Sequence, residues 1–337
     1  MMDVNDHDLL KGYLKHNGLA ADESSIRIEP LPGGVSCTVL KIITDEGRFV
    51  LKQALQKLNV KQEWLSDIER TNVEKRALGF LPSLIPGTTP RLVFDDEPNF
   101  VFLMECTPDS SLTWKQLLMA GHCNPVVAEK IGRILGDLHQ HSHHNEEAKQ
   151  LFAEKKYFVQ LRVDAFFGFL CHTHPDLQPL IHRHMDECLS IETSLVTGDY
   201  SPKNILVDGL QVIPIDFEVI HYGDSSFDLG FLSTHLMLKS IYFSERAEDY
   251  YEMLRKVLEG YFSVLRFMER SALEQRAVQQ LALIMLARVD GKSPVEYITA
   301  DTDKQLIRET SRAILHSGMR SYEEVISYLS KKQKIRS

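Results

Sequence analysis

The chain has 337 residues, which is enough for two domains with separate hydrophobic cores, and 43% of them are hydrophobic, as in an ordinary globular protein. Lysine and arginine total 38 against 47 acidic residues, a formal net charge of -9 that disfavours nucleic-acid partners. The acidic opening segment predicts that there is no signal peptide, and the apolar runs are too short to predict a membrane partner. The five cysteines are scattered and form no CxxC pair, which predicts reduced thiols in a cytoplasmic protein.

Residues 1–105 are predicted to form a β-rich lobe. Apolar residues alternate with polar ones from residue 35, and this run (35–43) and a second apolar run over 48–54 flank an acidic turn that contains glycine. This pattern predicts a β-hairpin. We also expect a charged helix over about 60–81 and a further strand over 101–106.

Residues 106–337 are predicted to form a larger, mostly helical lobe. Apolar residues recur at the i, i+3, i+4, i+7 spacing of one helix face over 131–138 and again over 251–265. One β-hairpin is expected to interrupt the helices over 205–216, with its turn at Asp208-Gly209.

Three polar residues around this hairpin have the spacing of a phosphoryl-transfer site. Asn204 is five residues after Asp199, and Asp216 is twelve residues after Asn204, at the end of the returning strand. Phosphoryl transfer needs a base for the hydroxyl proton and oxygen ligands for Mg²⁺. We therefore predict Asp199 as the catalytic base and Asn204 and Asp216 as metal ligands. The alternative is an ordinary surface turn, but a charged Asp216 between apolar neighbours is costly unless it is paired or metal-bound.

The segment 196–218 resembles the catalytic segment of the aminoglycoside phosphotransferase and choline kinase superfamily. The superfamily motif H-G-D-x4-N corresponds to Thr197-Gly198-Asp199 through Asn204, and its D-x-[DE] motif corresponds to Asp216-Phe217-Glu218. The chain departs from the motif at Thr197, where the superfamily usually has His, and this departure puts the orientation of the loop in question.

The resemblance implies an α+β, bilobal, protein-kinase-like fold, with a nucleotide-binding lobe at 1–105 and a helical lobe at 106–337 that carries the catalytic loop and the acceptor site. It also implies that ATP and Mg²⁺ are used, that the partner is a small molecule with a hydroxyl group, and that Glu218 supports the metal ligands.

The resemblance assigns nucleotide binding to residues of the first lobe. Lys52 corresponds to the Lys that pairs with the α- and β-phosphates, and Glu74, rather than Glu69, corresponds to the Glu that holds this Lys by an ion pair. The resemblance also implies that a Gly-rich turn contacts the phosphates of ATP and that the end of a strand contacts its adenine. The residues expected to make these contacts are Gly33, Gly34, Ser36, Glu105 and Cys106.

Further residues of the second lobe are expected to support the catalytic loop or to contact the acceptor. Asp228, in the block 222–232, corresponds to an Asp that fixes the catalytic loop by hydrogen bonds. Two charged segments beside helices are candidates for the acceptor site, although exposed charges are the default interpretation. Their candidate residues are Arg162, Asp164, Arg288, Asp290 and Lys292. His139 and His143 are four residues apart, but they lack a third metal ligand of suitable geometry.

The predicted function is an ATP-dependent kinase that phosphorylates a hydroxyl of a metabolite or an aminoglycoside-like acceptor. A pseudokinase that binds nucleotide without catalysis is the first alternative, and the presence of all four polar catalytic groups opposes it. A Ser/Thr protein kinase is the second, and it is opposed by Glu218 in place of Gly and by the lack of an APE segment. The identity of the acceptor stays open, as does the choice between a monomer and a homodimer.

Overall fold

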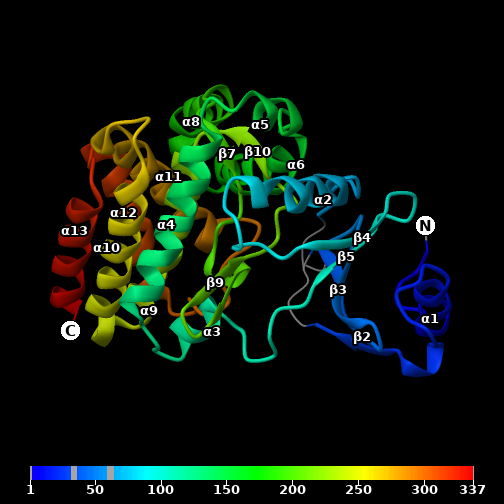
Figure 1. Ribbon diagram of the computed structural model, residues 1–337. Helices are drawn as coiled ribbons and strands as arrows, with labels where there is room; N and C mark the ends of the chain where they lie inside the picture. Colours follow the sequence, from blue (N-terminus) through cyan, green and yellow to red (C-terminus); the bar gives the residue numbers. More distant parts are fainter. Residues whose placement is uncertain (1, 32–35, 59–63, 337) are drawn as a thin grey trace. The chain divides into compact units, whose positions relative to one another are not determined.

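The computed structural model describes residues 2–31, 36–58 and 64–336. The chain divides into two compact units, Met1–Asp109 (unit 1) and Ser110–Ser337 (unit 2). No helix in these described ranges is both long enough and apolar enough to cross a membrane. The β-rich first unit and the mostly helical second unit confirm the predicted α+β class (Figure 1).

Unit 1 is built on one five-stranded antiparallel sheet with the strand order β1-β2-β3-β5-β4. The predicted hairpin is confirmed, because β2 and β3 pair continuously from Cys37↔Ala54 to Thr44↔Gly47. A hydrophobic cluster that includes Leu10 and Leu14 of α1 and Leu51 of β3 forms the core beside the sheet. The elements are α1 (His7–His16), η1 (Glu23–Ser25), β1 (Arg27–Pro30), β2 (Cys37–Thr44), β3 (Gly47–Ala54), α2 (Arg70–Phe80), η2 (Leu81–Ser83), β4 (Leu92–Asp96) and β5 (Val101–Glu105).

The prediction of a helix over about 60–81 is wrong over 64–69, because α2 begins only at Arg70, whereas 60–63 lie outside the described residues. The segment 64–66 lies against 56–58, since the Leu58 amide donates to the Trp64 carbonyl at 2.9 Å and the Ser66 amide donates to the Gln56 carbonyl at 3.0 Å. The Arg70 guanidinium then bonds to the Ser66 and Asp67 carbonyls at 3.1 and 2.8 Å. These bonds use backbone groups that a helix would need for its own ladder.

Unit 2 is a bundle of helices with two small sheets, β6-β8-β9 and β10-β7. Helix α9 is buried along almost its whole length, polar residues such as Asp228 and Lys239 included. The helical elements before the catalytic loop are α3 (Trp114–Met119), α4 (Pro125–Ser142), α5 (Glu146–Leu151), α6 (Lys156–Phe158), the π-helical η3 (Val159–Gly168), α7 (Phe169–Thr173), η4 (Pro175–Leu177) and α8 (Gln178–Ser190). The later ones are η5 (Pro202–Asn204), α9 (Ser226–Tyr242), η6 (Ser244–Arg246), α10 (Ala247–Val264), α11 (Arg270–Asp290), α12 (Asp301–Ser317) and α13 (Tyr322–Arg336). The strands are β6 (Leu112–Thr113), β7 (Ser194–Val196), β8 (Ile205–Asp208), β9 (Gln211–Pro214) and β10 (His221–Gly223).

The helices α4 and α10 lie side by side at very close range (Figure 1). A Cβ atom added at Gly132 of α4 would lie 1.9 Å from the Val257 carbonyl oxygen of α10, and one added at Gly260 would lie 1.9 Å from the Glu129 oxygen. Only a glycine at each position lets the two backbones approach this closely. The contact fixes α4, which carries His139 to the Asp228 carboxylate, as described below.

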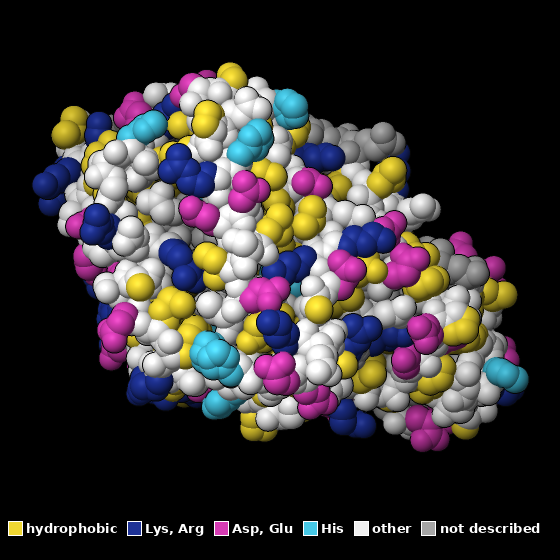
Figure 2. Space-filling view, turned by 90° about the horizontal axis from the view of Figure 1, so that it is seen from above, with side chains coloured by type: hydrophobic (Ala, Val, Ile, Leu, Met, Phe, Trp, Pro, Cys, Tyr) yellow, Lys and Arg dark blue, Asp and Glu magenta, His cyan; other side chains and the backbone are white. Residues whose placement is uncertain are grey.

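The charged side chains are mixed on the face of the molecule that Figure 2 shows. Lysine and arginine alternate there with aspartate and glutamate among the residues drawn in colour, and they do not gather into one broad basic area. This distribution agrees with the acidic overall balance of the sequence.

Candidate active site

The loop that carries Asp199 joins β7 to the β8/β9 hairpin of unit 2. β7 ends at Val196, and the short helix η5 leads directly into β8. The Ser201 amide donates to the Asp199 carbonyl at 2.8 Å, and the Asn204 amide donates to the Ser201 carbonyl at 2.9 Å. These local bonds hold the segment from Asp199 to Asn204 in a tight turn, so the two side chains have a fixed spacing.

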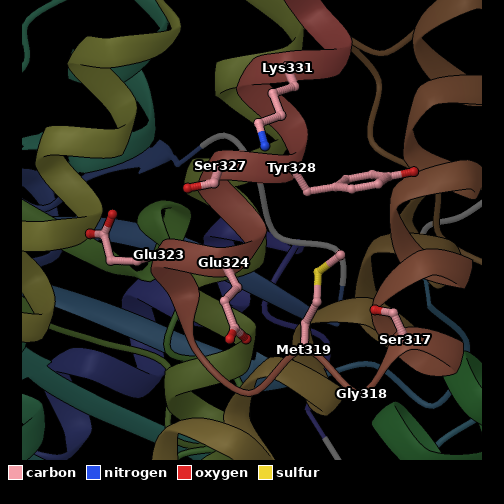
Figure 3. A pocket seen from close by; sticks show the side chains of 8 residues that line it. All are labelled: Ser317, Gly318, Met319, Glu323, Glu324, Ser327, Tyr328 and Lys331. Atoms are coloured by element: carbon pink, nitrogen blue, oxygen red, sulfur yellow. The ribbon is translucent and has the colours of Figure 1, made fainter.

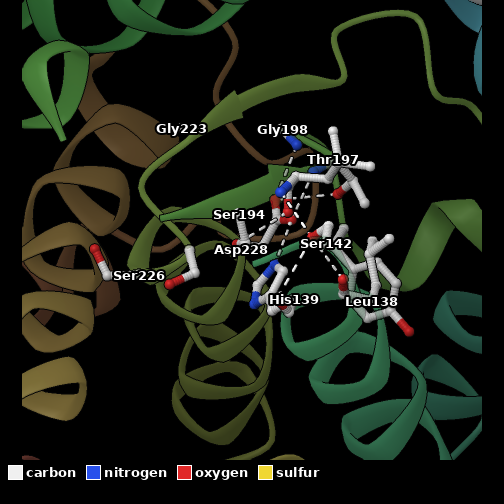
Figure 4. A network of polar contacts seen from close by, with 12 residues as sticks. Leu138, His139, Ser142, Ser194, Thr197, Gly198, Gly223, Ser226 and Asp228 are labelled. Carbon is white, nitrogen blue, oxygen red and sulfur yellow. Dashed lines mark hydrogen bonds and ion pairs between the residues drawn. The ribbon is translucent and has the colours of Figure 1, made fainter. Parts of the chain in front are cut away.

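Asp228 fixes the start of this loop by hydrogen bonds (Figure 4). Its wholly buried carboxylate accepts from the Thr197 amide at 2.6 Å, the Thr197 hydroxyl at 3.0 Å and the Gly198 amide at 2.9 Å. The His139 ring lies beside it, with Nε2 3.4 Å from Asp228 Oδ2 and Nδ1 2.7 Å from the Tyr261 hydroxyl. A buried carboxylate needs such donors to offset its lost hydration. The hydrogen bonds expected from Asp228 are therefore present.

The same network answers the question that Thr197 raised. The superfamily usually has a His at the position of Thr197. Here the Thr197 hydroxyl donates to Asp228 and so ties the loop to α9. An imidazole is supplied to the same carboxylate from another element, because His139 belongs to α4. His139 was considered in the sequence only as half of a metal pair, and nothing in its local sequence indicated this contact.

The Asp199 carboxylate is held on one of its two oxygens. Arg162 Nη2 lies 2.7 Å and Lys203 Nζ lies 3.0 Å from Asp199 Oδ2. The other oxygen, Oδ1, is buried and has no hydrogen-bond partner among the described residues. An unpaired buried carboxylate oxygen is costly, and such an exception calls for a functional explanation. Oδ1 is therefore the atom of Asp199 that could still accept a hydrogen bond from a ligand.

Arg162 contacts the predicted base itself. Its Nε donates to the Gly198 carbonyl at 2.8 Å, and its side chain is buried. Lys203 was missed by the sequence analysis, although it lies four residues after Asp199 within the predicted loop. That spacing was a usable signal, because a turn of this length brings such a side chain back toward the first residue.

The hairpin brings Asp216 beside Asn204, as the spacing predicted. β8 and β9 pair from Ile205↔Pro214 to Asp208↔Gln211, and the Ile215 amide donates to the Asn204 carbonyl at 2.9 Å. Asp216 has a φ of 70°, a left-handed conformation that is uncommon for non-glycine residues. Asn204 is buried, and its Nδ2 donates to the Asp199 carbonyl at 3.2 Å.

The chemistry of this pair suits Mg²⁺. Mg²⁺ takes oxygen ligands, keeps several waters and is commonly held by only one or two carboxylates together with substrate phosphates. One amide oxygen from Asn204 and one carboxylate from Asp216 match this requirement, and the buried Glu218 follows two residues later. Within the described ranges, no group of three or more His, Cys, Asp or Glu side chains is arranged as a self-sufficient metal site.

In unit 1, Lys52 and Glu74 form the ion pair that the sequence analysis expected. Lys52 Nζ lies 2.7 Å from both carboxylate oxygens of Glu74, and both side chains are buried. Lys52 is on β3 and Glu74 is on α2, so the pair joins the helix to the sheet. Glu69, the other candidate, precedes the first residue of α2.

The other expected nucleotide contacts of unit 1 have mixed surroundings. Ser36 is half-buried, and its carbonyl accepts from Arg70 at 2.6 Å, whereas Gly33 and Gly34 lie outside the described residues. The Glu105 amide already donates to the Arg91 carbonyl at 2.9 Å, and the Cys106 amide donates to the Arg48 carbonyl at 3.4 Å. The second bond is long, so the Cys106 amide is the easier of the two for a ligand to recruit.

The remaining acceptor candidates of unit 2 have different surroundings. Asp164 is exposed on η3, and Lys292 is half-buried after α11. The Asp290 carboxylate is engaged by Arg308 at 2.6 and 2.8 Å and by His174 at 3.0 Å, so it serves as a link between segments. Arg288 is different, because its guanidinium donates only to the Ser293 carbonyl and hydroxyl among the described residues.

A surface pocket lies between the end of α12 and the first turns of α13 (Figure 3). None of the predicted site residues lines this pocket. Its lining residues are Ser317, Gly318, Met319, Glu323, Glu324, Ser327, Tyr328 and Lys331.

A family model described as "Phosphotransferase enzyme family" matches residues 27–269, which include the Lys52–Glu74 pair, the Asp199 loop and Asp228. The chain belongs to this phosphotransferase family.

Relatives of this phosphotransferase-family chain include two curated proteins. A methylthioribose kinase of Pectobacterium carotovorum subsp. carotovorum (strain PC1) is 24% identical over 261 residues, 69% of this chain and 65% of the relative. A methylthioribose kinase of Bacillus cereus (strain ATCC 10987 / NRS 248) is 24% identical over 255 residues, 68% of this chain. The chain thus spans 65% of the length of these relatives.

Solved structures with the same fold are more distant in sequence. The amicoumacin kinase hAmiN, in complex with AMP-PNP, Ca²⁺ and Ami, has a TM-score of 0.60 at 11% identity, over 93% of this chain and 95% of that one. The choline kinase of Cryptosporidium parvum Iowa II has a TM-score of 0.59 at 15% identity, over 93% of this chain and 97% of that one. These likenesses establish the kinase-like fold of the phosphotransferase-family chain.

Proposed function

We propose that the chain is an ATP-dependent small-molecule kinase that transfers the γ-phosphate of ATP to a hydroxyl group. The observation that carries the proposal is the state of Asp199, whose Oδ2 is held by Arg162 and Lys203 while Oδ1 is buried and unpaired within the described part of the chain. The names of the methylthioribose kinase relatives support a small-molecule acceptor.

In the proposed reaction, the acceptor hydroxyl donates a hydrogen bond to Asp199 Oδ1. The hydroxyl oxygen forms a bond to the γ-phosphorus, the bond from that phosphorus to the β,γ-bridging oxygen breaks, and the hydroxyl proton passes to Oδ1. The Asp228 hydrogen bonds to Thr197 and Gly198 keep the base in position during this transfer. A fixed base needs little rearrangement, which is the main contribution that a protein makes to phosphoryl transfer.

Nucleotide binding is proposed for residues of unit 1. Lys52, held by Glu74, would pair with the α- and β-phosphates, Ser36 would contact the phosphates, and Glu105 and Cys106 would bind adenine. Asn204 and Asp216 would hold Mg²⁺, supported by Glu218. The ion would neutralise phosphate charge, which is the chemistry that it supplies in such sites.

The proposal is tested by ADP release with Mg-ATP across a panel of sugars, amino alcohols, aminoglycosides and hydroxy acids, together with a direct measurement of ATP binding. We expect binding of ATP and ADP release that depends on one class of acceptor. Binding without turnover on any acceptor would favour the nucleotide-binding pseudokinase, and absence of ATP binding would overturn the proposal.

The substitution Lys52→Met is expected to reduce kcat/KM for ATP by about 10²- to 10³-fold, because it removes the buried cation proposed to pair with the phosphates. It also leaves the Glu74 carboxylate buried without its ion-pair cation, so the melting temperature should be recorded in the same samples. The control is Lys15→Met, at an exposed lysine of α1 whose contact with Glu23 is long at 3.8 Å. The measurement is steady-state kinetics with varied ATP. A wild-type kcat/KM for ATP in both variants would contradict the assignment of Lys52 to nucleotide binding.

A further inference from the structure

Two arginines of unit 2 share one aromatic ring beside the proposed base. The Cζ atoms of Arg162 and Arg288 each lie 5.8 Å from the centroid of Phe166, and Arg162 Cζ lies at the same distance from the Phe231 ring. Arg162 is the residue that pairs with Asp199. The two guanidinium groups therefore lie close together beside Asp199 rather than dispersed over the surface.

Arg288 has no carboxylate partner among the residues that the structure describes. Its Nη1 donates to the Ser293 carbonyl at 2.6 Å and to the Ser293 hydroxyl at 3.2 Å, while its Nε is buried and unpaired in that same set. Burial holds the pKa of the Arg288 guanidinium below its usual value. A guanidinium has five N–H donors in a planar fork, so most of this group's donors are left for a planar anion.

Lys239 of α9, like Arg288, is a cation without an anionic partner in the described part of the chain. Its side chain is buried, its Nζ has only the His235 carbonyl at 3.4 Å, and it lies over the Tyr297 ring at 5.2 Å. Burial, followed by Lys115, lowers the pKa of Lys239 to about 7, and Glu296 opposes part of this effect. An anion placed beside this amine would favour its charged form.

The buried His235 lies between two parts of this cluster, since its ring packs edge-on against Phe231 and its carbonyl accepts from Lys239. Its pKa is held well below the usual value, first by burial and then by Lys239, Arg288, Lys203 and Lys115, in that order. Phe231, His235 and Lys239 are spaced four residues apart on α9 and so lie on one face of this helix. Two carboxylates lie near these cations. Asp199 already pairs with Arg162 and Lys203, and Glu296 already pairs with Lys115. The cations therefore outnumber the carboxylates in this cluster.

We propose that the hydroxyl acceptor is an anion, whose carboxylate or phosphate group is bound by Arg288 and Lys239 while its hydroxyl lies at Asp199 Oδ1. This inference rests on the proposed kinase function and specifies its substrate class. The buried Tyr297 hydroxyl, which lacks a hydrogen-bond partner among the described residues, provides a further donor for the same group. A cationic acceptor such as choline would instead meet like charges in a buried site, where repulsion is poorly screened.

The test compares matched pairs of acceptors that differ only in the anionic group. Glycerate is paired with glycerol, and ribose 5-phosphate is paired with ribose, so that the panel separates carboxylates from phosphates. Binding is measured by calorimetry without nucleotide, and turnover is measured by ADP release with Mg-ATP. We expect the anionic member of at least one pair to bind and react, with KM at least about tenfold lower than that of its neutral counterpart. Turnover confined to neutral or cationic acceptors would overturn the inference and leave the kinase proposal intact.

The residues are tested with Arg288→Gln and Lys239→Met. Each substitution should raise the KM or Kd for the anionic compound by about 10- to 100-fold, the usual effect of losing a charge-assisted hydrogen bond, without changing the Kd for ATP. Arg183→Gln, at an exposed arginine of α8, is the control and should leave both constants unchanged. Anion binding that depends on Arg288 and Lys239 in a chain without any turnover would support the anion site and refute the kinase proposal. Unchanged anion affinity in both variants would refute the anion site.

Discussion

Replacement of Asp199 by Asn is expected to lower kcat by about 10²- to 10⁴-fold, the usual contribution of a general base, with little change in the Kd for ATP. The amide oxygen of Asn can still accept from Arg162 Nη2 and Lys203 Nζ, which now bond to Oδ2. The loop should therefore keep its conformation, while the group that accepts the hydroxyl proton is lost. The measurement is steady-state ADP release with saturating acceptor, together with ATP titration and the melting temperature.

The control for this prediction is the same change at Asp208, which is half-buried. Asp208 lies at the turn end of the β8/β9 hairpin, and the loop that carries Asp199 joins the opposite end. Asp208→Asn should retain the wild-type kcat. If Asp199→Asn kept more than about a tenth of the activity, a base contribution of the usual size would be excluded.

The second large effect is expected on stability, at the contact between α4 and α10. Gly132→Ala should reduce the free energy of unfolding by about 2 to 3 kcal/mol, since the new methyl group would lie 1.9 Å from the Val257 carbonyl oxygen and the helices must move apart. The better helix propensity of alanine offsets only about 1 kcal/mol. Urea unfolding followed by circular dichroism measures the change.

The matched substitution is Gly79→Ala in α2, where an added Cβ meets no atom within 4 Å. This variant should be as stable as the wild type or up to about 1 kcal/mol more stable, because only helix propensity changes. Gly260→Ala, on the opposite side of the α4–α10 contact, should cost about as much as Gly132→Ala. The double variant should cost less than the sum, because the first substitution already separates the helices. Equal stability of the Gly132 and Gly79 variants would show that the helix contact is looser than the structure indicates.

The features that the sequence predicted well are those set by local spacing. The β8/β9 hairpin follows from two short apolar runs around Asp208-Gly209, and its register alone brings Asp216 to Asn204. The partners in this hairpin are joined by one regular element, so the chain between them determines where they lie. The Lys52–Glu74 ion pair, by contrast, was expected from the resemblance to the superfamily and not from spacing alone.

The features that the sequence did not predict depend on partners that are distant in the chain. Arg162 reaches Asp199 from η3, and His139 reaches Asp228 from α4. Neither contact has a spacing rule, since both are created by the packing of helices. The start of α2 was misplaced for a related reason, because the hydrogen bonds of Ser66 to Gln56 compete with a helix whose charged sequence has ordinary propensity.

The glycines between α4 and α10 also bear on how this chain can vary during evolution. Gly132 faces the backbone of α10 and Gly260 faces the backbone of α4, so we expect strong purifying selection at both positions. Orthologous chains should keep small residues there while the outer faces of both helices drift. A glycine preserved for this reason would resemble a phosphate-binding glycine in an alignment, and only its place in a helix–helix contact distinguishes the two.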